Sequence, residues 1–143
     1  MPKPKKGDLV HLYRRKIGGA GLLLKKITNV EERYGVNLNE IVAQKRNYTE
    51  VPWSLKSRAA IEDLYPDIPG TEVNDLIDIV SVLESYCSRW DEETKRRSLK
   101  PTYHKDFSKV RWLKPPGEYS EEPAAFYKNK EAWLPTSWLK VLK

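Results

Sequence analysis

EAWLPTSWLKVLK, residues 131–143, contains two of the five tryptophans of the chain and is typical of two short strands joined by a tight turn. In the second strand the period of two puts Trp138 and Lys140 on one face. Leu139 and Val141 lie on the other face. A lysine marks its face as partly exposed, so we expect Leu139 and Val141 in the core of a sheet and Trp138 covered from outside that core.

The first strand of this stretch leaves one choice open. Trp133 and Leu134 point to opposite faces, and the sequence does not decide which of them points into the core. The Pro-Thr-Ser segment at 135–137 supplies the turn. We interpret both tryptophans as packing side chains that tie the sheet to a helical insertion, or to a neighbouring subunit, rather than as a ligand cage.

Three further segments predict strands. Residues 9–14 alternate after a Gly-Asp turn. Residues 22–27 follow a glycine-rich loop in which Gly21 marks a bend or a close approach to another strand. Residues 108–113 alternate basic and apolar side chains. Five strands of this length suit a small barrel.

The middle of the chain has helical periodicity instead. Helices are predicted within residues 37–47 and 54–65, and the strongest spans residues 71–97. The apolar stripe of that last helix includes Cys87 and Trp90. Three acid-to-base pairs at i,i+4 follow, each expected to stabilise the helix by roughly 0.2–0.5 kcal/mol. They are Asp91–Lys95, Glu92–Arg96 and Glu93–Arg97.

These elements predict an α+β fold. Residues 1–28 and 107–143 form a five-stranded barrel, and residues 29–106 form a helical insertion between its second and third strands. The pieces KKGDLV, GGAGLLLKKI, KVRWL and EAWLPTSWLKVL resemble SH3-like barrels, including the KOW and Tudor varieties. In that pattern a Gly-Asp turn opens the first strand, a glycine precedes the second, and a short turn joins the last two.

The chain as a whole resembles, in style, the small virion proteins of tailed bacteriophages. Many of these join a GDLV-type start to an end of the form W(L/V)P and WL(K/E)V across variable inserts. Here GDLV lies at residues 7–10, WLP at 133–135 and WLKV at 138–141. The resemblance implies a structural protein of the virion, in its connector, tail or baseplate region, assembled in the host cytoplasm.

Composition indicates the class of partner. The 143 residues carry 26 Lys and Arg against 20 Asp and Glu, a formal net charge of +6. A basic balance favours anionic partners such as nucleic acid or acidic protein surfaces. No apolar run approaches the roughly 20 residues that a membrane span needs, and the basic start MPKPKKGD lacks the apolar core of a signal peptide. We expect neither a membrane partner nor a small-molecule substrate.

The sequence offers little for catalysis or metal binding. Cys87 is the only cysteine, so it forms no disulfide within the chain, and its place on the apolar stripe predicts a buried thiol. His11 and His104 are separated by almost the whole chain. The GGAG run at 18–21 lacks the Gly-Lys-Ser/Thr ending of a phosphate loop. We therefore expect a non-enzymatic protein without cofactor or metal.

Basic and aromatic side chains make up the candidate partner-binding set. They could anchor a protein interface, stack on bases or cage a cation. The Pro-rich link at 115–130 and the arm at 1–6 are the segments expected to reach a partner. The candidate residues are Tyr13, Arg14, Arg15, Lys16, Arg111, Trp112, Lys114, Tyr119, Phe126 and Tyr127.

Two functions remain open on the sequence alone. In the first, the chain locks onto copies of itself or onto other virion proteins by burying aromatic anchors. In the second, the same basic residues contact phosphates, as in a KOW-type nucleic-acid-binding module, and binding weakens steeply with salt. A third interpretation is purely structural, with the charges solvating the barrel and the aromatics packed inside it.

Overall fold

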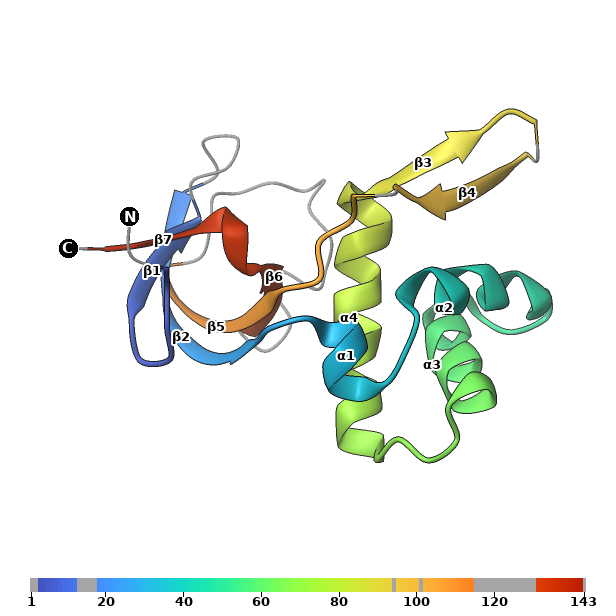
Figure 1. Ribbon diagram of the computed structural model, residues 1–143, viewed down its shortest axis with the longest axis horizontal. Helices are drawn as coiled ribbons and strands as arrows, with labels where there is room; N and C mark the ends of the chain where they lie inside the picture. The colour runs from blue at the N-terminus through green and yellow to red at the C-terminus, as the bar shows by residue number, and fades with distance from the viewer. Residues whose placement is uncertain (1–2, 13–17, 94, 101, 115–130, 143) are drawn as a thin grey trace. The chain divides into compact units, whose positions relative to one another are not determined.

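The chain forms two compact units. A sheet unit comprises residues 1–30 and 105–143, and a helical unit comprises residues 31–104. Figure 1 draws the strands of the sheet unit in blue, orange and red, and the helical unit in cyan to yellow. The computed structural model describes residues 3–12, 18–93, 95–100, 102–114 and 131–142.

The sheet unit is a five-stranded antiparallel sheet with the strand order β6-β5-β2-β1-β7. Its strands are β1 (Leu9–Leu12), β2 (Gly18–Ile27), β5 (Phe107–Lys114), β6 (Glu131–Pro135) and β7 (Leu139–Val141). Strand β1 pairs with β2, β2 with β5, and β5 with β6, and the last strand, β7, pairs with β1. All four pairings are antiparallel. The predicted α+β class and the five strands are confirmed, and the structure shows that they pair antiparallel.

The sheet is strongly curled. Strands β6 and β7 stand at opposite ends of the strand order, yet only the three-residue 3₁₀ helix η5 (Thr136–Trp138) connects them. Three residues of 3₁₀ helix advance about 6 Å, so the two edge strands must approach each other. Within the described residues β6 pairs only with β5, and β7 only with β1. A closed barrel is therefore not established by the pairings.

One face of the sheet forms its core. Val10 and Leu12 of β1, Val110 of β5 and Leu139 of β7 are at most 4 % exposed. The core position predicted for Leu139 is confirmed. Val141 stands opposite Val10 on the same face, but it is half-buried because it ends an edge strand.

Glycines of the sheet unit lie where a strand begins, where the chain turns, or where two strands approach each other closely. Gly7 adopts φ +92° in the turn before β1, as the Gly-Asp pattern predicts. A Cβ on Gly21 would lie 2.3 Å from a Val110 methyl carbon and 3.2 Å from a ring carbon of Trp112. The expected close approach is confirmed. A hairpin or a wide loop was expected at Gly18 and Gly19. Strands β1 and β2 do pair antiparallel, but Gly18 already stands opposite Leu12 and begins β2.

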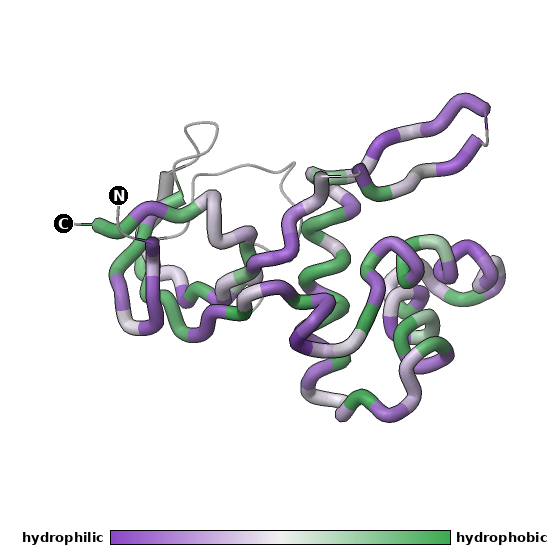
Figure 2. Tube along the Cα trace, in the orientation of Figure 1, coloured by the Kyte–Doolittle hydropathy of each residue, from purple (hydrophilic) through white to green (hydrophobic). Residues whose placement is uncertain are grey.

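The helical unit follows the chain in order. It contains α1 (Val30–Tyr34), α2 (Leu38–Gln44), the 3₁₀ helix η2 (Lys45–Asn47), α3 (Trp53–Leu64), α4 (Gly70–Tyr86), and the strands β3 (Ser88–Asp91) and β4 (Arg96–Leu99). Figure 2 shows hydrophobic positions recurring along α4, where Val73, Leu76, Ile79, Val80 and Leu83 are buried. That spacing keeps one stripe of the helix in the core.

The longest helix is shorter than predicted. It ends at Tyr86 rather than at Arg97. The backbone leaves the helical region at Cys87, with φ −121°, and the Ser88 hydroxyl donates to the carbonyl of Glu84 in the last turn. A side chain that bonds back to the helix in this way competes with continued helix formation.

A β-hairpin replaces the missing end of the helix. Strands β3 and β4 form a two-stranded antiparallel sheet in which Asp91 stands opposite Arg96, and Trp90 opposite Arg97. Lys95 adopts φ 55° in the connecting turn. The predicted i,i+4 pairs are wrong. Acids followed by bases at this spacing satisfy cross-strand pairing as well as helical pairing.

Candidate functional site

Most of the predicted partner-binding set lies outside the described residues. Seven of the ten residues are in this group: Tyr13, Arg14, Arg15, Lys16, Tyr119, Phe126 and Tyr127. The link at 115–130 falls there as well. The remaining three, Arg111, Trp112 and Lys114, belong to β5.

Trp112 is a core residue. It shares the inner face of β5 with Val110, stands opposite Gly21, and is 4 % exposed. A ring enclosed in this way offers no face on which a base or a partner side chain can stack. For Trp112 the structure favours the packing interpretation over the partner-binding one.

Arg111 is exposed, but its charge is balanced within the sheet. Its Nη2 lies 2.9 Å and its Nε 3.2 Å from Oε2 of Glu131, directly across on β6. Lys109 Nζ lies 3.3 Å from the other oxygen of the same carboxylate. The bonds from Arg111 hold the pKa of Glu131 below its ordinary value, against a smaller opposing effect of burial. A phosphate at this site would have to compete with a resident carboxylate.

The two tryptophans of residues 131–143 are both buried. Trp133 is 1 % exposed and Trp138 is 6 % exposed. Trp133 stands opposite Lys109 and so lies on the outer face of the sheet, whereas Leu134 stands opposite Ser108 on the inner face. This settles the open choice of direction. The last strand was predicted to begin at Trp138. Trp138 lies instead in η5, and β7 begins one residue later, at Leu139.

Three leucines lie side by side on the outer face of the sheet. Leu9 stands opposite Leu22, and the Leu142 N–H donates to the Leu9 carbonyl at 2.8 Å. Leu9 is 47 % exposed and Leu142 is 41 % exposed, while Leu22 is half-buried. We call Leu142, Leu9 and Leu22 the leucine row. Large apolar side chains grouped in water mark candidate interaction surfaces.

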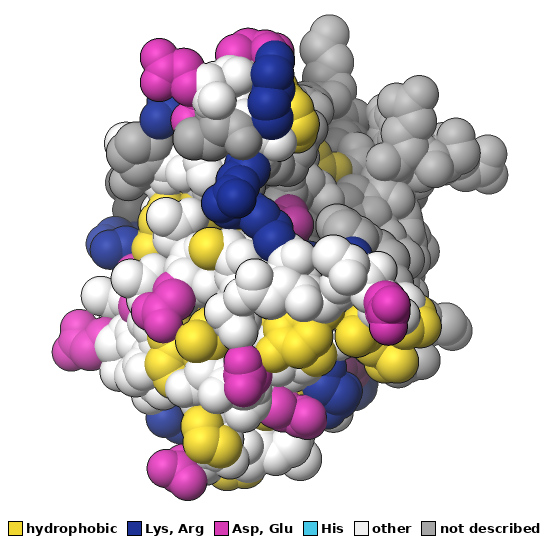
Figure 3. Space-filling view, turned by 90° about the vertical axis from the view of Figure 1, so that its right-hand side faces the viewer, with side chains coloured by type: hydrophobic (Ala, Val, Ile, Leu, Met, Phe, Trp, Pro, Cys, Tyr) yellow, Lys and Arg dark blue, Asp and Glu magenta, His cyan; other side chains and the backbone are white. Residues whose placement is uncertain are grey.

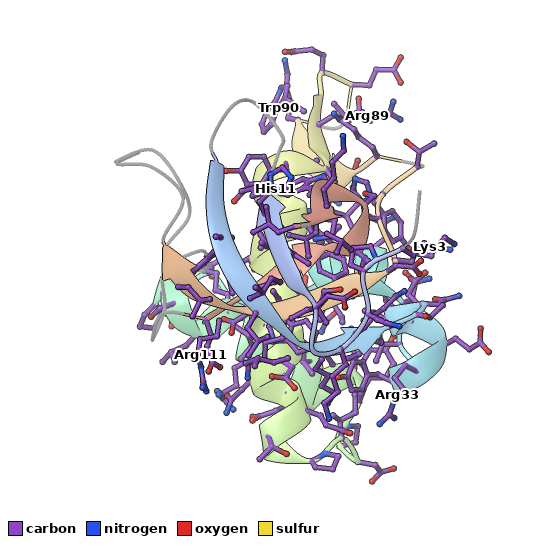
Figure 4. The ribbon with its side chains drawn as sticks, turned by 90° about the vertical axis from the view of Figure 1, so that its left-hand side faces the viewer. Lys3, His11, Arg33, Arg89, Trp90 and Arg111 are labelled. Atoms are coloured by element: carbon purple, nitrogen blue, oxygen red, sulfur yellow. The ribbon has the colours of Figure 1, made fainter. Side chains whose placement is uncertain are left out.

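Basic residues border the leucine row. Lys140 of β7 stands opposite His11 of β1, two positions along from Leu142 and Leu9. Arg111 stands opposite Leu22 at the other end of the row. Figure 4 shows His11 and Arg111 on their strands of this unit. The outer face is therefore apolar in its middle and basic at its borders.

The β3–β4 hairpin carries an exposed aromatic side chain. Trp90 is 51 % exposed, and alternation puts Arg89 and Arg96 on the opposite face of the hairpin. Figure 4 labels Arg89 and Trp90. No third strand joins this sheet within the part of the chain that the structure describes. A lone two-stranded hairpin is marginally stable in water at best.

The base of the hairpin is fixed to the helical unit. Leu99 is 5 % exposed, and its N–H donates to the side-chain oxygen of Asn39 at 3.3 Å. The Lys100 N–H donates to the Cys87 carbonyl at 2.7 Å. Ordered at its base, the hairpin holds Trp90 in a defined place.

Sequence reasoning missed Trp90 as a surface residue because it placed this side chain on a helical stripe. A usable signal was present at the turn. Asp91 accepts the N–H of Glu93 at 2.9 Å, the local bond through which Asp favours turns over helix interiors. Asp91, followed by two more acids directly after Trp90, therefore indicates a possible turn at this point of the chain.

The two units have opposite net charge. Residues 1–30 and 105–143 contain 16 Lys and Arg against 6 Asp and Glu, a formal charge of +10. Residues 31–104 contain 10 against 14, a formal charge of −4. The chain total of +6 therefore combines a strongly basic sheet unit with an acidic helical unit.

Polar contacts inside the helical unit have structural roles. The Tyr103 hydroxyl donates to Glu31 at 2.6 Å, and the Leu38 N–H donates to the same oxygen at 2.9 Å, which ties α1 to the start of α2. Burial, and then the bond to Glu31, raises the pKa of Tyr103. Lys45 and Glu84 form a largely buried ion pair.

Cys87 is 6 % exposed, so the predicted buried thiol is confirmed. His11 and His104 belong to different units. Among the described residues, no group of three or more His, Cys, Asp or Glu is placed to hold a metal ion. None of the described helices is both long and apolar enough to cross a membrane.

Comparisons of the chain with protein-family models, with curated proteins and with solved structures find no match. Function is therefore inferred from the surfaces described above.

Proposed function

We propose that the chain is a non-enzymatic structural or assembly protein that acts through protein–protein interfaces, as a component of a tailed-phage virion. The observation that carries this proposal is Trp90, which is half exposed on a hairpin that no third strand joins among the residues that the structure describes. Tryptophan is enriched among the residues that dominate binding at protein interfaces. Covering the exposed half of its roughly 200 Å² would contribute on the order of 2–3 kcal/mol.

The hairpin carries charges of both signs around Trp90. Asp91, Glu92 and Glu93 follow Trp90 directly. Glu92 forms an exposed ion pair with Lys95 at 2.8 Å, and Glu93 is exposed. The same hairpin carries four basic residues, so its charge does not select between phosphate and protein, and the argument for a protein partner rests on the exposed ring of Trp90. The basic residues are Arg89, Lys95, Arg96 and Arg97.

Two features support an SH3-like arrangement for the sheet unit. The last strand pairs with the first, and a single 3₁₀ turn joins the last two strands. Both are what a five-stranded sheet needs in order to curl toward a small barrel. A barrel of this kind would serve as the rigid body from which interface residues are presented.

Site-specific cross-linking tests the assembly function. A photo-reactive amino acid at position 90 is introduced into the chain while particles assemble, and the purified particles are analysed by mass spectrometry. We expect the chain to be present in the particles at a fixed copy number and cross-linked through residue 90 to a structural protein. The same label at exposed Thr49 is the control. A chain absent from purified particles would contradict the proposal.

Nucleic-acid binding is the second candidate, and the charge of +10 on the sheet unit favours it. A KOW-type module of this charge would retard DNA or RNA in a gel, with an affinity that falls steeply as salt rises. The ion pairs of Arg111 and Lys109 with Glu131 argue against it for the described part of β5, because a phosphate there would compete with the carboxylate. Retardation that persists at about 150 mM salt, near physiological ionic strength, would promote this candidate above the first.

A further inference from the structure

The β3–β4 hairpin has an open edge along β3. Figure 1 shows β4 on the side of the hairpin toward α2 and β3 on the side away from it. The Leu99 N–H of β4 donates to Asn39 of α2, so the outer edge of β4 is partly occupied. No described strand pairs with the outer edge of β3. Such an edge presents backbone N–H and C=O groups to which another strand can add.

The hydrogen-bond pattern of the hairpin fixes which residues face this open edge. The Lys100 N–H donates to the Cys87 carbonyl at 2.7 Å, and the two strands pair residue by residue from there toward the turn. Bonded and non-bonded pairs alternate along an antiparallel ladder. The backbone groups of Arg89 and Asp91 therefore bond to β4. Those of Trp90 point outward, to the open edge.

Unlike charges flank Trp90 along this strand. Arg89 precedes the tryptophan and Asp91 follows it, and alternation puts both on the face opposite to the ring. Figure 4 shows Arg89 and Trp90 on opposite sides of the hairpin. Figure 3 shows basic and acidic side chains side by side at its upper end, where the hairpin lies. Arg89 is exposed, and its side chain forms no ion pair or hydrogen bond with another described residue.

Asp91 can accept a second cation. Its Oδ1 accepts the Glu93 N–H at 2.9 Å, and Arg96 stands opposite it on β4. An ionised carboxylate has about four lone-pair sites. Glu131 of β6 already pairs with two cations of β5 in this way. An arginine that arrives at the open edge of β3 would lie beside Asp91 on the side away from Arg96.

Resting on the interface function proposed above for Trp90, we infer that two copies of the chain pair edge to edge through β3, antiparallel, with Trp90 opposite Trp90 of the second copy. The N–H and C=O of each Trp90 then bond to those of the other, and the two hairpins form one four-stranded sheet. The two rings lie side by side on one face, as cross-strand aromatic pairs do. On the other face, Arg89 of each copy stands opposite Asp91 of the other.

Charge selects this register. The direction of the backbone groups allows symmetric pairings centred on residue 89, 90 or 91 of this short strand and excludes those centred between two residues. A centre at 89 puts two arginines directly opposite each other, and a centre at 91 puts two aspartates there. Like charges at such positions are destabilising. The centre at Trp90 instead gives two unlike pairs, at the non-bonded positions where opposite side chains are closest.

Strand β4 does not offer a second copy the same match. Its sequence is Arg-Arg-Ser-Leu, preceded by Lys95 and followed by Lys100. Symmetric antiparallel pairings centred on residues 96, 97 or 98 all put basic residues opposite one another. Pairing of β3 with β4 of another copy would compete with the bond from the Leu99 N–H to Asn39.

Pairing through β3 is closed. Both copies use the same edge, so the dimer has two-fold symmetry and leaves no β3 edge for a third copy. The paired stretch is short, which puts this contact among the small, weak protein interfaces. The lone hairpin gains the further strands that a sheet needs for stability in water.

Sedimentation equilibrium of the full chain measures its association. We expect the mean mass to rise from that of a monomer toward that of a dimer, and no further, as the concentration rises to about 0.5 mM, the range in which a weak interface is populated. A wild-type chain that stays monomeric throughout this range, or that forms larger species, overturns the inference.

Two charge reversals test the register. Arg89→Asp turns both unlike pairs into acid against acid, and Asp91→Arg turns them into base against base. Each variant alone is expected to dimerise at least roughly tenfold more weakly than the wild type. Mixed in equal amounts, they restore two unlike pairs in the mixed dimer and are expected to associate like the wild type. A mixture as weak as the single variants, or single variants as tight as the wild type, overturns the inference.

A matched reversal elsewhere separates the register from net charge. Lys25 is exposed on β2 of the sheet unit, and Lys25→Asp changes the net charge as Arg89→Asp does. This variant is expected to dimerise like the wild type. Dimerisation weakened equally in Lys25→Asp and Arg89→Asp would show that net charge, and not the pairing of β3, controls association, and it overturns the inference.

Disulfide formation tests the register directly, and it decides the question if circular dichroism shows that Asp91→Arg is unfolded. Trp90→Cys puts two thiols across a bonded pair with Cα atoms about 5.5 Å apart, within reach of a disulfide. Arg89→Cys puts its two thiols on a diagonal of about 7–8 Å, at the limit of that reach or beyond it. Under mild oxidation we expect a linked dimer from Trp90→Cys and little from Arg89→Cys, with the wild type, whose Cys87 is buried, as the blank. Equal yields from the two variants, including none from either, overturn the inference.

The two proposals fail in different ways. A monomeric wild-type chain that still cross-links through residue 90 to another structural protein of the particle overturns the pairing through β3 and leaves the assembly function standing. A dimer with the expected register that is absent from purified particles does the reverse.

Discussion

The dipeptide Arg-Trp occurs in two strands of this chain with opposite outcomes. In β5, Arg111 is exposed and Trp112 is 4 % exposed. In β3, Arg89 is exposed and Trp90 is 51 % exposed. The local residue types are alike, so the difference arises from what each strand pairs with.

Strand β5 is paired on both edges, with β2 and β6, whereas β3 is paired on one edge, with β4, and no described strand pairs with its other edge. The sheet around β5 also provides a space for the ring, because Gly21 has no side chain where Trp112 lies. Opposite Trp90 stands Arg97. Whether a tryptophan becomes core or surface is thus decided by the neighbouring strands, which no short stretch of sequence contains.

Removing each ring in turn is the strongest way to break this comparison. Trp112→Ala is expected to destabilise the protein by about 3–5 kcal/mol, because it leaves a cavity in the core of the sheet. Trp90→Ala should change the free energy of unfolding by no more than about 0.5 kcal/mol, as an exposed substitution does. Urea unfolding followed by circular dichroism measures both. Similar losses in the two variants would show that Trp90 packs as core.

Filling the space at Gly21 sharpens the comparison. Gly21→Ala places a methyl group 2.3 Å from a Val110 methyl carbon and 2.9 Å from the Arg111 carbonyl oxygen. Strands β2 and β5 must then separate, at an expected cost of about 1–3 kcal/mol. The midpoint of urea unfolding should fall, and the near-ultraviolet signal of Trp112 should change. Gly35→Ala, where the added Cβ meets no atom within 4 Å, tests the strain of a positive φ alone.

A third aromatic, Tyr34 in the helical unit, gives the smallest effect. Its hydroxyl is buried and has no hydrogen-bond partner within the described residues. Burial, with smaller contributions from the charges of Asp75 and Glu72, raises the pKa of Tyr34 to about 12, against a lowering effect of Arg33. Tyr34→Phe removes an unsatisfied group and is expected to stabilise the protein by about 1 kcal/mol.

The pH dependence of Tyr34 follows from the sign of its shift. The folded state disfavours the ionised phenol, so the stability linked to Tyr34 is complete below pH 10 and is lost as the pH rises toward about 12. Stability of Tyr34→Phe should therefore fall less steeply than that of the wild type across this interval. Urea titrations at several alkaline pH values measure the two slopes, and equal slopes would contradict the assignment.

The sheet could be predicted from the sequence because strands leave a local signature. Alternation placed Leu139 in the core and separated Val110 from Arg111 correctly. Gly21 could be predicted to lie against another strand because only a residue without a side chain fits there. The end of α4 was missed, since acids at 91–93 and bases at 95–97 fit the charge pairing of a helix and of a hairpin alike, and only the turn preference of Asp91 distinguishes the two.

The candidate surfaces were harder to predict than the strands. Trp112 was counted among partner-binding residues because it stands between basic residues, and only the pairing of β5 on both edges shows that it is core. The leucine row joins Leu9, Leu22 and Leu142, which are distant in sequence and meet through strand register alone. The charge of each unit could be counted only once the boundary between the units was known.

The ends of the helical unit have a practical consequence for protein engineering. The Val30 N–H donates to the Lys105 carbonyl at 2.8 Å, and the Asn29 N–H donates to Asp106 at 2.9 Å, so the chain leaves the sheet and returns to it at a single point. Topologically, 74 residues occupy the place of one reverse turn between β2 and β5. Such a junction is suited to excision, shortening or grafting, and the sheet can serve as a host for foreign domains whose own termini lie close together.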